Sequence, residues 1–324
     1  MQRIYFFEGP PGAGKSSLSQ WVAQQLTAAG APVVWLEEHT LNATVFNHFL
    51  TALDDAEQDA IASLLADWRR FLAGVAAGDA IYCLDGAFFH STLSRLYAYH
   101  YSATQIAAYL ATLYNLLTPL APPLIHLTGD VTAILRAIIA ERGARWVAII
   151  AQTVAIYPCL QGAAPLDAAA LTRFFVDRQR ELDTVAAAYP FAYYRNDTTA
   201  RDWTRLQREV SDWLDIAVQP ATPPAARDLP QYVGVYQTPA EFPPEFNHPF
   251  TVEQTADGLR LHMFFMRNLR LAAQEGDCFA IVGRPNILEF VRDEGATVVG
   301  AIYPFVPDQR FFCTKIGDEN TEVR

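Results

Sequence analysis

The first two thirds of the chain alternate short apolar runs with longer stretches of helical periodicity. The apolar runs predict five β-strands, at residues 3–7, 32–36, 80–84, 123–127 and 191–194. Apolar positions three or four residues apart predict helices at residues 15–29, 54–77, 89–99, 103–118, 131–140, 167–188 and 200–216. Strands and helices in alternation are typical of a parallel sheet flanked by helices. We therefore expect an α/β domain over residues 1–217, a three-layer sandwich around a five-stranded parallel sheet.

The pattern changes after this region. Residues 218–228 are rich in Pro and Ala, which predicts an extended linker. Beyond the linker, short aromatic and β-branched runs are separated by turn sequences such as Asp257-Gly258 and Asp293-Glu294-Gly295. We expect residues 229–324 to form a small antiparallel β-domain, a barrel or half-barrel, with residues 317–324 as a frayed tail.

Composition and charge narrow the classes of function. The 324 residues include 24 basic and 35 acidic side chains, a formal net charge of -11, which disfavours binding to a nucleic acid polymer or a membrane surface. No apolar run approaches the ~20 residues of a membrane span. The N-terminal apolar run is too short for a signal peptide and ends at Glu8. The four cysteines are widely separated, as expected of reduced thiols. These features predict a cytoplasmic protein.

Residues 9–16, GPPGAGKS, match the phosphate-binding pattern G-x-x-x-x-G-K-[ST]. The motif follows a predicted strand and precedes a predicted helix, where glycines let backbone N–H groups surround an anion and the helix N-terminus adds positive charge. The chain has only two lysines, and Lys15 occupies the motif position that requires one. We expect Lys15 to bridge the β- and γ-phosphates of ATP and Ser16 to hold Mg²⁺. The other expected nucleotide-binding residues are Gly9, Gly12, Ala13, Gly14 and Ser17.

Carboxylates follow the predicted strands. Glu8, the pair Glu37 and Glu38, and Asp85 stand at the ends of the first three strands, which face one crevice in an open parallel sheet. A carboxylate there can accept a proton from an attacking hydroxyl, orient the acceptor or hold a Mg²⁺ water. Asp85 precedes Gly86, so a turn-forming role is the alternative. Which of Glu37 and Glu38 faces the crevice is left open by the pattern.

Cationic and aromatic residues complete the candidate site. Arg142 and Arg145 follow the fourth strand beside Gly143, and planar guanidinium groups suit the charge of a transferring phosphoryl group. A solvated helix end is the alternative for these arginines. After Asp85, a segment dense in aromatic residues contains His90 and Arg95, which we expect to bind a small organic acceptor.

These motifs resemble the nucleoside and nucleotide kinases of the thymidylate-kinase and deoxynucleoside-kinase type. The likeness covers residues 1–216 and implies a P-loop NTPase fold, with Lys15 and Ser16 at the phosphates and Asp85 and a Glu of the 37/38 pair on the acceptor side. Arg142 and Arg145 would be lid arginines, and Asn196 would border the adenine. The chain departs from the family in having Gly86 after Asp85 where an arginine is usual. A non-nucleotide small alcohol therefore stays an alternative to a nucleoside or nucleotide acceptor.

The C-terminal part resembles the lipocalin-like β-domain appended to penicillin-binding-type serine hydrolases. The likeness rests on residues 232–236, 250–253, 257–259 and 288–295. It implies a domain that packs or dimerises, so that a homodimer is open, or one that holds an apolar ligand in its cup. For the whole chain we expect an ATP- and Mg²⁺-dependent phosphotransferase acting on a small-molecule acceptor. The alternative is a regulatory module that binds nucleotide and hydrolyses it slowly.

Overall fold

The computed structural model describes residues 2–55, 58–162, 166–219, 228–243, 247–263, 266–306 and 309–317. The chain divides into two units, one of Met1–Ile139 with Val147–Gln219 and one of Ala140–Trp146 with Pro220–Arg324. Most of the predicted linker and the predicted tail lie outside the described residues. Within the described part, no helix combines the length and apolar character needed to cross a membrane.

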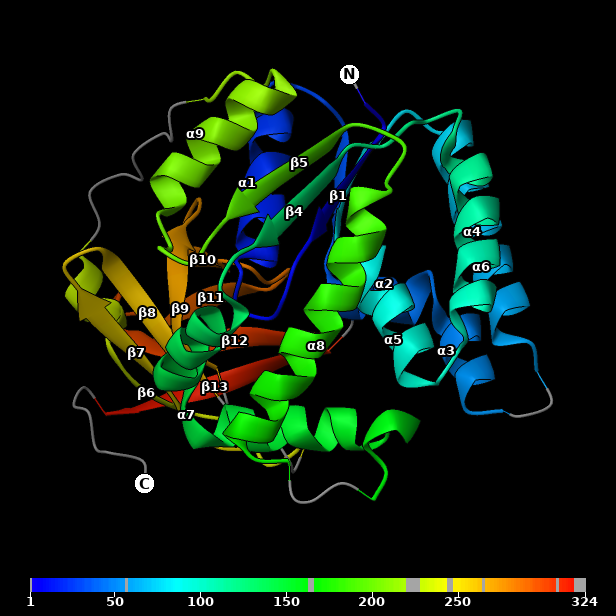
Figure 1. The fold of residues 1–324 in the computed structure, drawn as a ribbon. Helices are drawn as coiled ribbons and strands as arrows, with labels where there is room; N and C mark the ends of the chain where they lie inside the picture. The colour runs from blue at the N-terminus through cyan, green and yellow to red at the C-terminus, as the bar shows by residue number, and fades with distance from the viewer. Residues whose placement is uncertain are drawn as a thin grey trace. The chain divides into compact units, whose positions relative to one another are not determined.

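The first unit is built on a five-stranded parallel sheet (Figure 1). Its order is β2-β3-β1-β4-β5, so β1 lies in the centre. The strands are β1 (Ile4–Glu8), β2 (Val33–Leu36), β3 (Ile81–Asp85), β4 (Leu124–Thr128) and β5 (Tyr193–Asp197). The predicted sheet is confirmed, and the carboxyl ends of β1 and β3 lie side by side, with Phe7 paired to Asp85.

The sheet is buried on both faces because its strands are apolar at successive positions. Along β1, Ile4 and Phe6 join one apolar cluster, and Tyr5 and Phe7 join the other. The cluster around Tyr5 and Phe7 includes α1 (Lys15–Ala28) and α9 (Trp203–Leu214). The opposite cluster includes α4 (Ala60–Ala77), α6 (Ala103–Leu117) and α8 (Ala168–Ala187) (Figure 1).

Short helices were the part of the fold that periodicity missed. The structure contains α2 (Glu38–Thr44) and α3 (Asn47–Leu53). No helix was predicted between the second strand and residue 54. The predicted helix 54–77 begins only at α4, capped by Asp59, which accepts from the Ala62 amide at 3.0 Å. The predicted helix 89–99 is a π-helical turn, η1 (Phe89–Leu93), followed by α5 (Ser94–Ala98).

The helix after β4 is longer than its prediction. α7 (Val131–Ala155) continues past residue 140, with a non-helical break at Gly143 (φ 79°, ψ -176°). A positive φ favours glycine, so this residue permits the break. The 3₁₀ turn η2 (Pro158–Leu160) follows α7.

The second unit contains a closed antiparallel barrel of eight strands, which confirms the β-domain as a barrel. After the 3₁₀ turn η3 (Leu229–Tyr232), the order around the barrel is β10-β11-β12-β13-β6-β7-β8-β9. The strands are β6 (Gly234–Gln237), β7 (Phe250–Thr255), β8 (Gly258–Met263), β9 (Met266–Ala273), β10 (Cys278–Ile281), β11 (Ile287–Arg292), β12 (Val298–Val306) and β13 (Gln309–Gly317). Aromatic side chains pack in its core, with Tyr236 stacked on Phe250 at 5.1 Å. The resemblance to a lipocalin-like domain remains an expectation.

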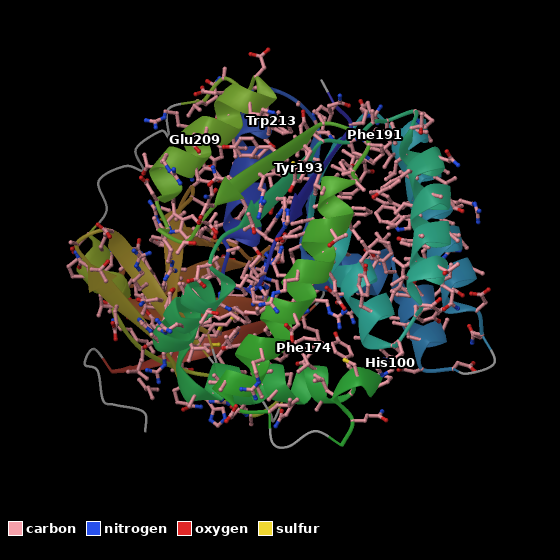
Figure 2. All side chains as sticks on the ribbon, in the orientation of Figure 1. His100, Phe174, Phe191, Tyr193, Glu209 and Trp213 are labelled. Carbon is pink, nitrogen blue, oxygen red and sulfur yellow. The ribbon has the colours of Figure 1, made fainter. Side chains whose placement is uncertain are left out.

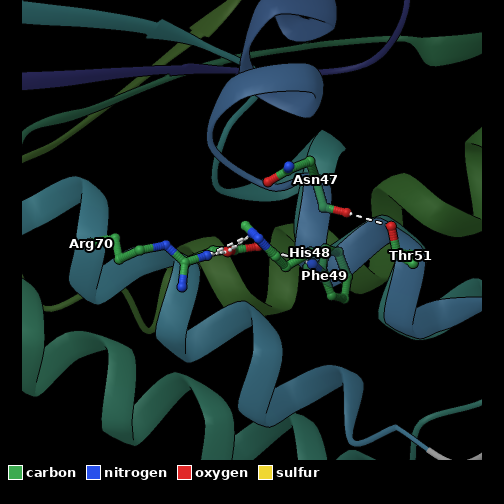
Figure 3. A network of polar contacts seen from close by, with 6 residues as sticks. Asn47, His48, Phe49, Thr51 and Arg70 are labelled. Carbon is green, nitrogen blue, oxygen red and sulfur yellow. Dashed lines mark hydrogen bonds and ion pairs between the residues drawn. The ribbon is translucent and has the colours of Figure 1, made fainter.

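A buried aspartate on α4 forms hydrogen bonds with the start of α3 (Figure 3). Asp67 on α4 is 1% exposed and accepts from the Phe49 amide at 2.9 Å, at the start of α3. Its other carboxylate oxygen contacts His48 Nδ1 at 3.1 Å and the guanidinium of Arg70. The carboxylate therefore satisfies an amide that α3 itself leaves without a partner.

Replacing Asp67 with alanine is expected to lower the free energy of unfolding by about 2 kcal/mol, because the Phe49 amide loses its acceptor inside the protein. Asp177→Ala is the matched control, since Asp177 also pairs with an arginine three residues later, Arg180 at 2.8 Å, but is 70% exposed. That exposed pair should contribute less than about 0.5 kcal/mol. Urea denaturation of both variants measures the difference, and equal losses would contradict the assignment.

Candidate active site

The glycine-rich loop adopts a conformation that requires its glycines. Gly9, Gly12 and Gly14 have φ values of 148°, 84° and 92°. A Cβ at Gly14 would lie 2.5 Å from the Trp203 ring, and one at Gly9 would lie 2.1 Å from the Leu127 carbonyl oxygen. The loop between β1 and α1 is thus held against β4 and the start of α9. Its conformation suits an anion at the N-terminus of α1.

Lys15 is the first residue of α1 and is 9% exposed. Its ammonium donates to the Pro10 carbonyl at 3.3 Å, across the loop. Ala13 is buried, its amide donating to the Pro10 carbonyl at 3.2 Å; Ser16 is half-buried and Ser17 is exposed. The ammonium of Lys15 is therefore held against the glycine-rich loop, as predicted for a lysine that binds phosphate.

Asp85 ends β3 and is 2% exposed. Burial raises the pKa of Asp85, while the charge of Lys15 and a hydrogen bond from Ser16 act to lower it. The structure thus brings together the three side chains that were predicted to bind the phosphates, Mg²⁺ and the acceptor. Oδ1 of Asp85 has no hydrogen-bond partner among the described residues. A buried carboxylate oxygen without a partner can accept from a ligand.

The structure distinguishes the two glutamates that follow β2. Glu37 caps α2, accepting from the Thr40 amide at 2.8 Å and from the His39 amide at 3.1 Å. Glu38 forms an ion pair with His90, Oε1 to Nε2 at 3.3 Å. Burial acts to raise the pKa of Glu38, but the charge and hydrogen bond of His90, together with the charges of His39 and Lys15, hold that pKa below its usual range. Glu38 is thus held as a carboxylate paired with His90, and Glu37 caps α2.

Glu8 lies beneath this site and fixes the turn that follows β3. It is fully buried and accepts from the Phe88 amide at 2.6 Å and the His90 amide at 3.3 Å. Burial raises the pKa of Glu8 to about 8, although the Phe89 and Phe88 amides and the charge of Lys15 act to lower it. Its bond to the His90 amide makes it a positioning residue for the His90–Glu38 pair.

Two predicted acceptor residues lie on the turn and helix after β3. His90 contacts Glu38 as described, and a Cβ at Gly86 would lie 3.2 Å from His90 and 3.9 Å from Lys15. Arg95 is half-buried on α5, where its Nε donates to the Ser91 carbonyl at 3.1 Å. A side chain at position 86 would therefore contact His90 and Lys15.

The predicted lid arginines lie around the break in α7. Arg142 and Arg145 belong to the stretch Ala140–Trp146, which groups with the second unit. The Arg142 guanidinium lies over the Trp146 ring, 5.8 Å from its centroid, and Arg145 is exposed. In the first unit, a Cβ at Gly12 would lie 3.1 Å from Ile138, so the first half of α7 packs on the glycine-rich loop.

Asn196, predicted to border the adenine, is buried on β5. Its Nδ2 donates to Glu209 at 2.7 Å and to the Tyr194 hydroxyl at 3.0 Å, while its Oδ1 has no partner among the described residues. Glu209 comes from α9, one turn before Trp213 (Figure 2). The Asn196 amide group is therefore oriented by α9.

Sequence reasoning missed Arg178. This residue of α8 is 9% exposed, and its guanidinium lies over Tyr97 at 5.3 Å and Phe174 at 5.5 Å. Its position in the sequence could have identified it, because Arg178 is spaced as part of the buried face of the helix. That face otherwise consists of Leu171, Phe175, Gln179, Leu182, Val185 and Ala186.

His126 on β4 is part of the core. It is fully buried, with Nδ1 2.9 Å from the Tyr193 hydroxyl and Nε2 2.9 Å from the Gln179 amide nitrogen. Burial lowers the pKa of His126 to about 4 from an ordinary 6.5, with Asp183 acting in the opposite direction. The folded protein therefore holds a neutral imidazole at neutral pH.

This lowered pKa predicts a loss of stability in acid. The stability is present above pH 6.5 and is lost as the pH falls through about 4, because the unfolded chain takes up the proton first. Between pH 7 and pH 5, the free energy of unfolding of the native protein should fall by about 2 kcal/mol relative to that of His126→Gln. Urea denaturation at both pH values measures this difference. Parallel pH profiles for the two proteins would contradict the assignment.

Among the described residues, no group of three or more His, Cys, Asp or Glu side chains is placed to hold a metal ion. The Ser16 hydroxyl is a hard oxygen donor of the kind Mg²⁺ takes when nucleotide phosphates and water supply its remaining ligands, and Asp85 beside it can accept from a water on that ion. These residues fit a Mg²⁺ that arrives with a nucleotide.

Comparison with known proteins gives similarities of fold only. No family model and no curated protein matches the sequence. A deoxyadenosine kinase from M. mycoides with bound dATP is similar at 14% identity and a TM-score of 0.38, over 66% of this chain and 100% of that one. The same enzyme with bound dCTP gives 16% and 0.36, over 65% and 98%. A shikimate kinase from Bacteroides thetaiotaomicron gives 16% and 0.36, over 67% and 100%.

Proposed function

We propose that this protein is a phosphotransferase that moves the γ-phosphoryl group of Mg²⁺-ATP to a small-molecule acceptor. One observation carries the proposal: Lys15, Ser16 and Asp85 interact at the mouth of the glycine-rich loop, where Asp85 keeps a buried oxygen without a partner. A glycine-rich loop by itself accounts for the lysine and the serine. The buried carboxylate beside them adds a group that can act on an acceptor.

The residues have separate tasks in the proposed reaction. Backbone amides of the loop and the Lys15 ammonium bind the nucleotide phosphates and neutralise charge on the transferring group. Mg²⁺, held by Ser16 together with the phosphates, supplies further charge neutralisation. Asp85 and Glu38 orient the acceptor, and one of them takes the proton when the acceptor is a hydroxyl. Arg142 and Arg145 are proposed to act as lid arginines.

The acceptor is proposed to be a small hydroxyl or phosphate compound. The family resemblance places nucleosides and nucleotides first, and the Gly86 departure keeps a non-nucleotide alcohol beside them. Asn196 is proposed to lie beside the nucleotide base.

An acceptor screen with ATP consumption as the readout tests this function. We expect at least one nucleoside, nucleotide or small alcohol to raise ATP consumption about tenfold or more above the rate without acceptor. A regulatory module would instead consume ATP at a slow rate that no acceptor changes. That second result would contradict the transferase proposal.

A further inference from the structure

Beyond Asp85, side chains from four separate elements of the first unit form one polar cluster. Glu38 comes from α2, Arg95 from α5, Tyr157 from the turn that precedes η2, and Arg178 from α8. Burial raises the pKa of the Tyr157 hydroxyl, and the charges of Arg95, Glu38 and Arg178 all act on it. Ring contacts join the same elements, because Arg178 lies over Tyr97 of α5 at 5.3 Å and the Tyr157 ring lies 6.3 Å from that of Phe174 on α8.

Aromatic rings lie next to this polar cluster. Tyr99 lies 6.1 Å from Tyr157, ring centroid to ring centroid, and Arg178 lies over Tyr97 and Phe174. Rings of this kind give a small organic molecule apolar contact area and leave hydroxyl groups for orientation. The cluster is therefore suited to a small organic molecule with a charged end.

Carboxylates neutralise the two arginines of the cluster only in part. Arg95 is half-buried and has no carboxylate within ion-pair distance in the described part of the chain. Arg178 donates to Glu181 at 2.5 Å, but Glu181 is 46% exposed, and the buried Nε of Arg178 has no hydrogen-bond partner among the described residues. Burying a guanidinium N–H without an acceptor is costly, so a structural role alone explains this arrangement poorly.

Glu38 is the acidic residue of the cluster, but it does not neutralise Arg95 or Arg178. Glu38 is paired with His90 at 3.3 Å. A ligand that carries its own negative charge would give Arg95 and Arg178 an acceptor, and planar guanidinium groups suit the two oxygens of a carboxylate or phosphate.

We propose that the acceptor carries a carboxylate or phosphate group and that Arg95 and Arg178 bind it. This inference rests on the proposed transferase function and names its substrate class. An acceptor oxygen attacks the γ-phosphorus, the new O–P bond forms, and the bond to the β–γ bridging oxygen breaks to release ADP. When that oxygen is a hydroxyl, its proton passes to Asp85 or Glu38 and then to water.

Matched pairs of acceptors test the charge directly. The pairs are shikimate with its methyl ester, for a carboxylate, and deoxyadenosine monophosphate with deoxyadenosine, for a phosphate. We expect the charged member of at least one pair to have a kcat/KM at least tenfold above that of its neutral partner, and the pair that responds identifies the anion. If the neutral members are used equally well, the transferase survives and this inference is overturned. If no acceptor in an extended panel is used, the transferase proposal itself fails.

Variants identify the residues that bind the anion. Arg95→Gln and Arg178→Gln should each raise the KM for the charged acceptor at least tenfold and leave the KM for its neutral partner within twofold. Arg180→Gln is the matched control, because Arg180 lies two residues from Arg178 on α8 but is 74% exposed. Arg95 is half-buried, so its variant remains informative if Arg178→Gln does not fold. Equal changes in KM for both acceptors of a pair would overturn the assignment.

Discussion

Replacing Lys15 with alanine is expected to slow phosphoryl transfer by about 10³-fold, about 4 kcal/mol of transition-state stabilisation. The reason is local, because Lys15 holds its ammonium across the glycine-rich loop, 3.3 Å from the Pro10 carbonyl, beside Asp85. The change removes charge neutralisation at the γ-phosphate. Steady-state rates with the acceptor found in the screen measure the effect.

The chain offers an unusually clean control for this variant. Its only other lysine is Lys315, on β13 of the barrel, where the ammonium donates to the Gln231 carbonyl at 3.2 Å. Lys315→Ala removes the same group from the other unit and should leave transfer within about twofold of the native rate. Circular dichroism should show both variants folded. A Lys15→Ala protein with full activity would contradict the assigned role.

Replacing Asp85 with asparagine is the second change with a large expected effect. The amide is nearly the same size but cannot take up a proton, so kcat should fall about 10²- to 10⁴-fold. Asp85 is buried, and its Oδ1 has no partner among the described residues, so the free energy of unfolding should change by less than about 1 kcal/mol. Transfer rates and urea denaturation of the same preparation test both statements.

A structural carboxylate would give the opposite outcome. If Asp85 only shaped the turn before Gly86, the asparagine variant would lose stability and keep its rate. Asp59→Asn is the matched control, since Asp59 caps α4 through the Ala62 amide and asparagine caps as well as aspartate. That variant should retain both stability and rate.

The sequence predicted the parts of the site whose chemistry lies in adjacent residues. The glycines, Lys15 and Ser16 form one short motif, and the strand before it and the helix after it follow from local periodicity. The end of β3 placed Asp85 beside this loop because neighbouring parallel strands end at the same edge.

Other parts of the site depend on contacts that no local pattern contains. Glu37 and Glu38 follow β2 directly and begin α2, so neither strand nor helix periodicity could assign the one that reaches His90. Arg178 lies on α8, far along the chain from the motif, and reaches the cluster only through the packing of that helix on the sheet. The helices α2 and α3 have seven residues each, too few to show a clear period.

The most direct test of the central claim is ³¹P NMR of the products after ATP and Mg²⁺ are incubated with the protein and the best acceptor of the screen. The account predicts ADP and a phosphorylated acceptor in equal amounts, with neither formed by Lys15→Ala. ADP accompanied by inorganic phosphate alone, in amounts independent of the acceptor, would contradict it.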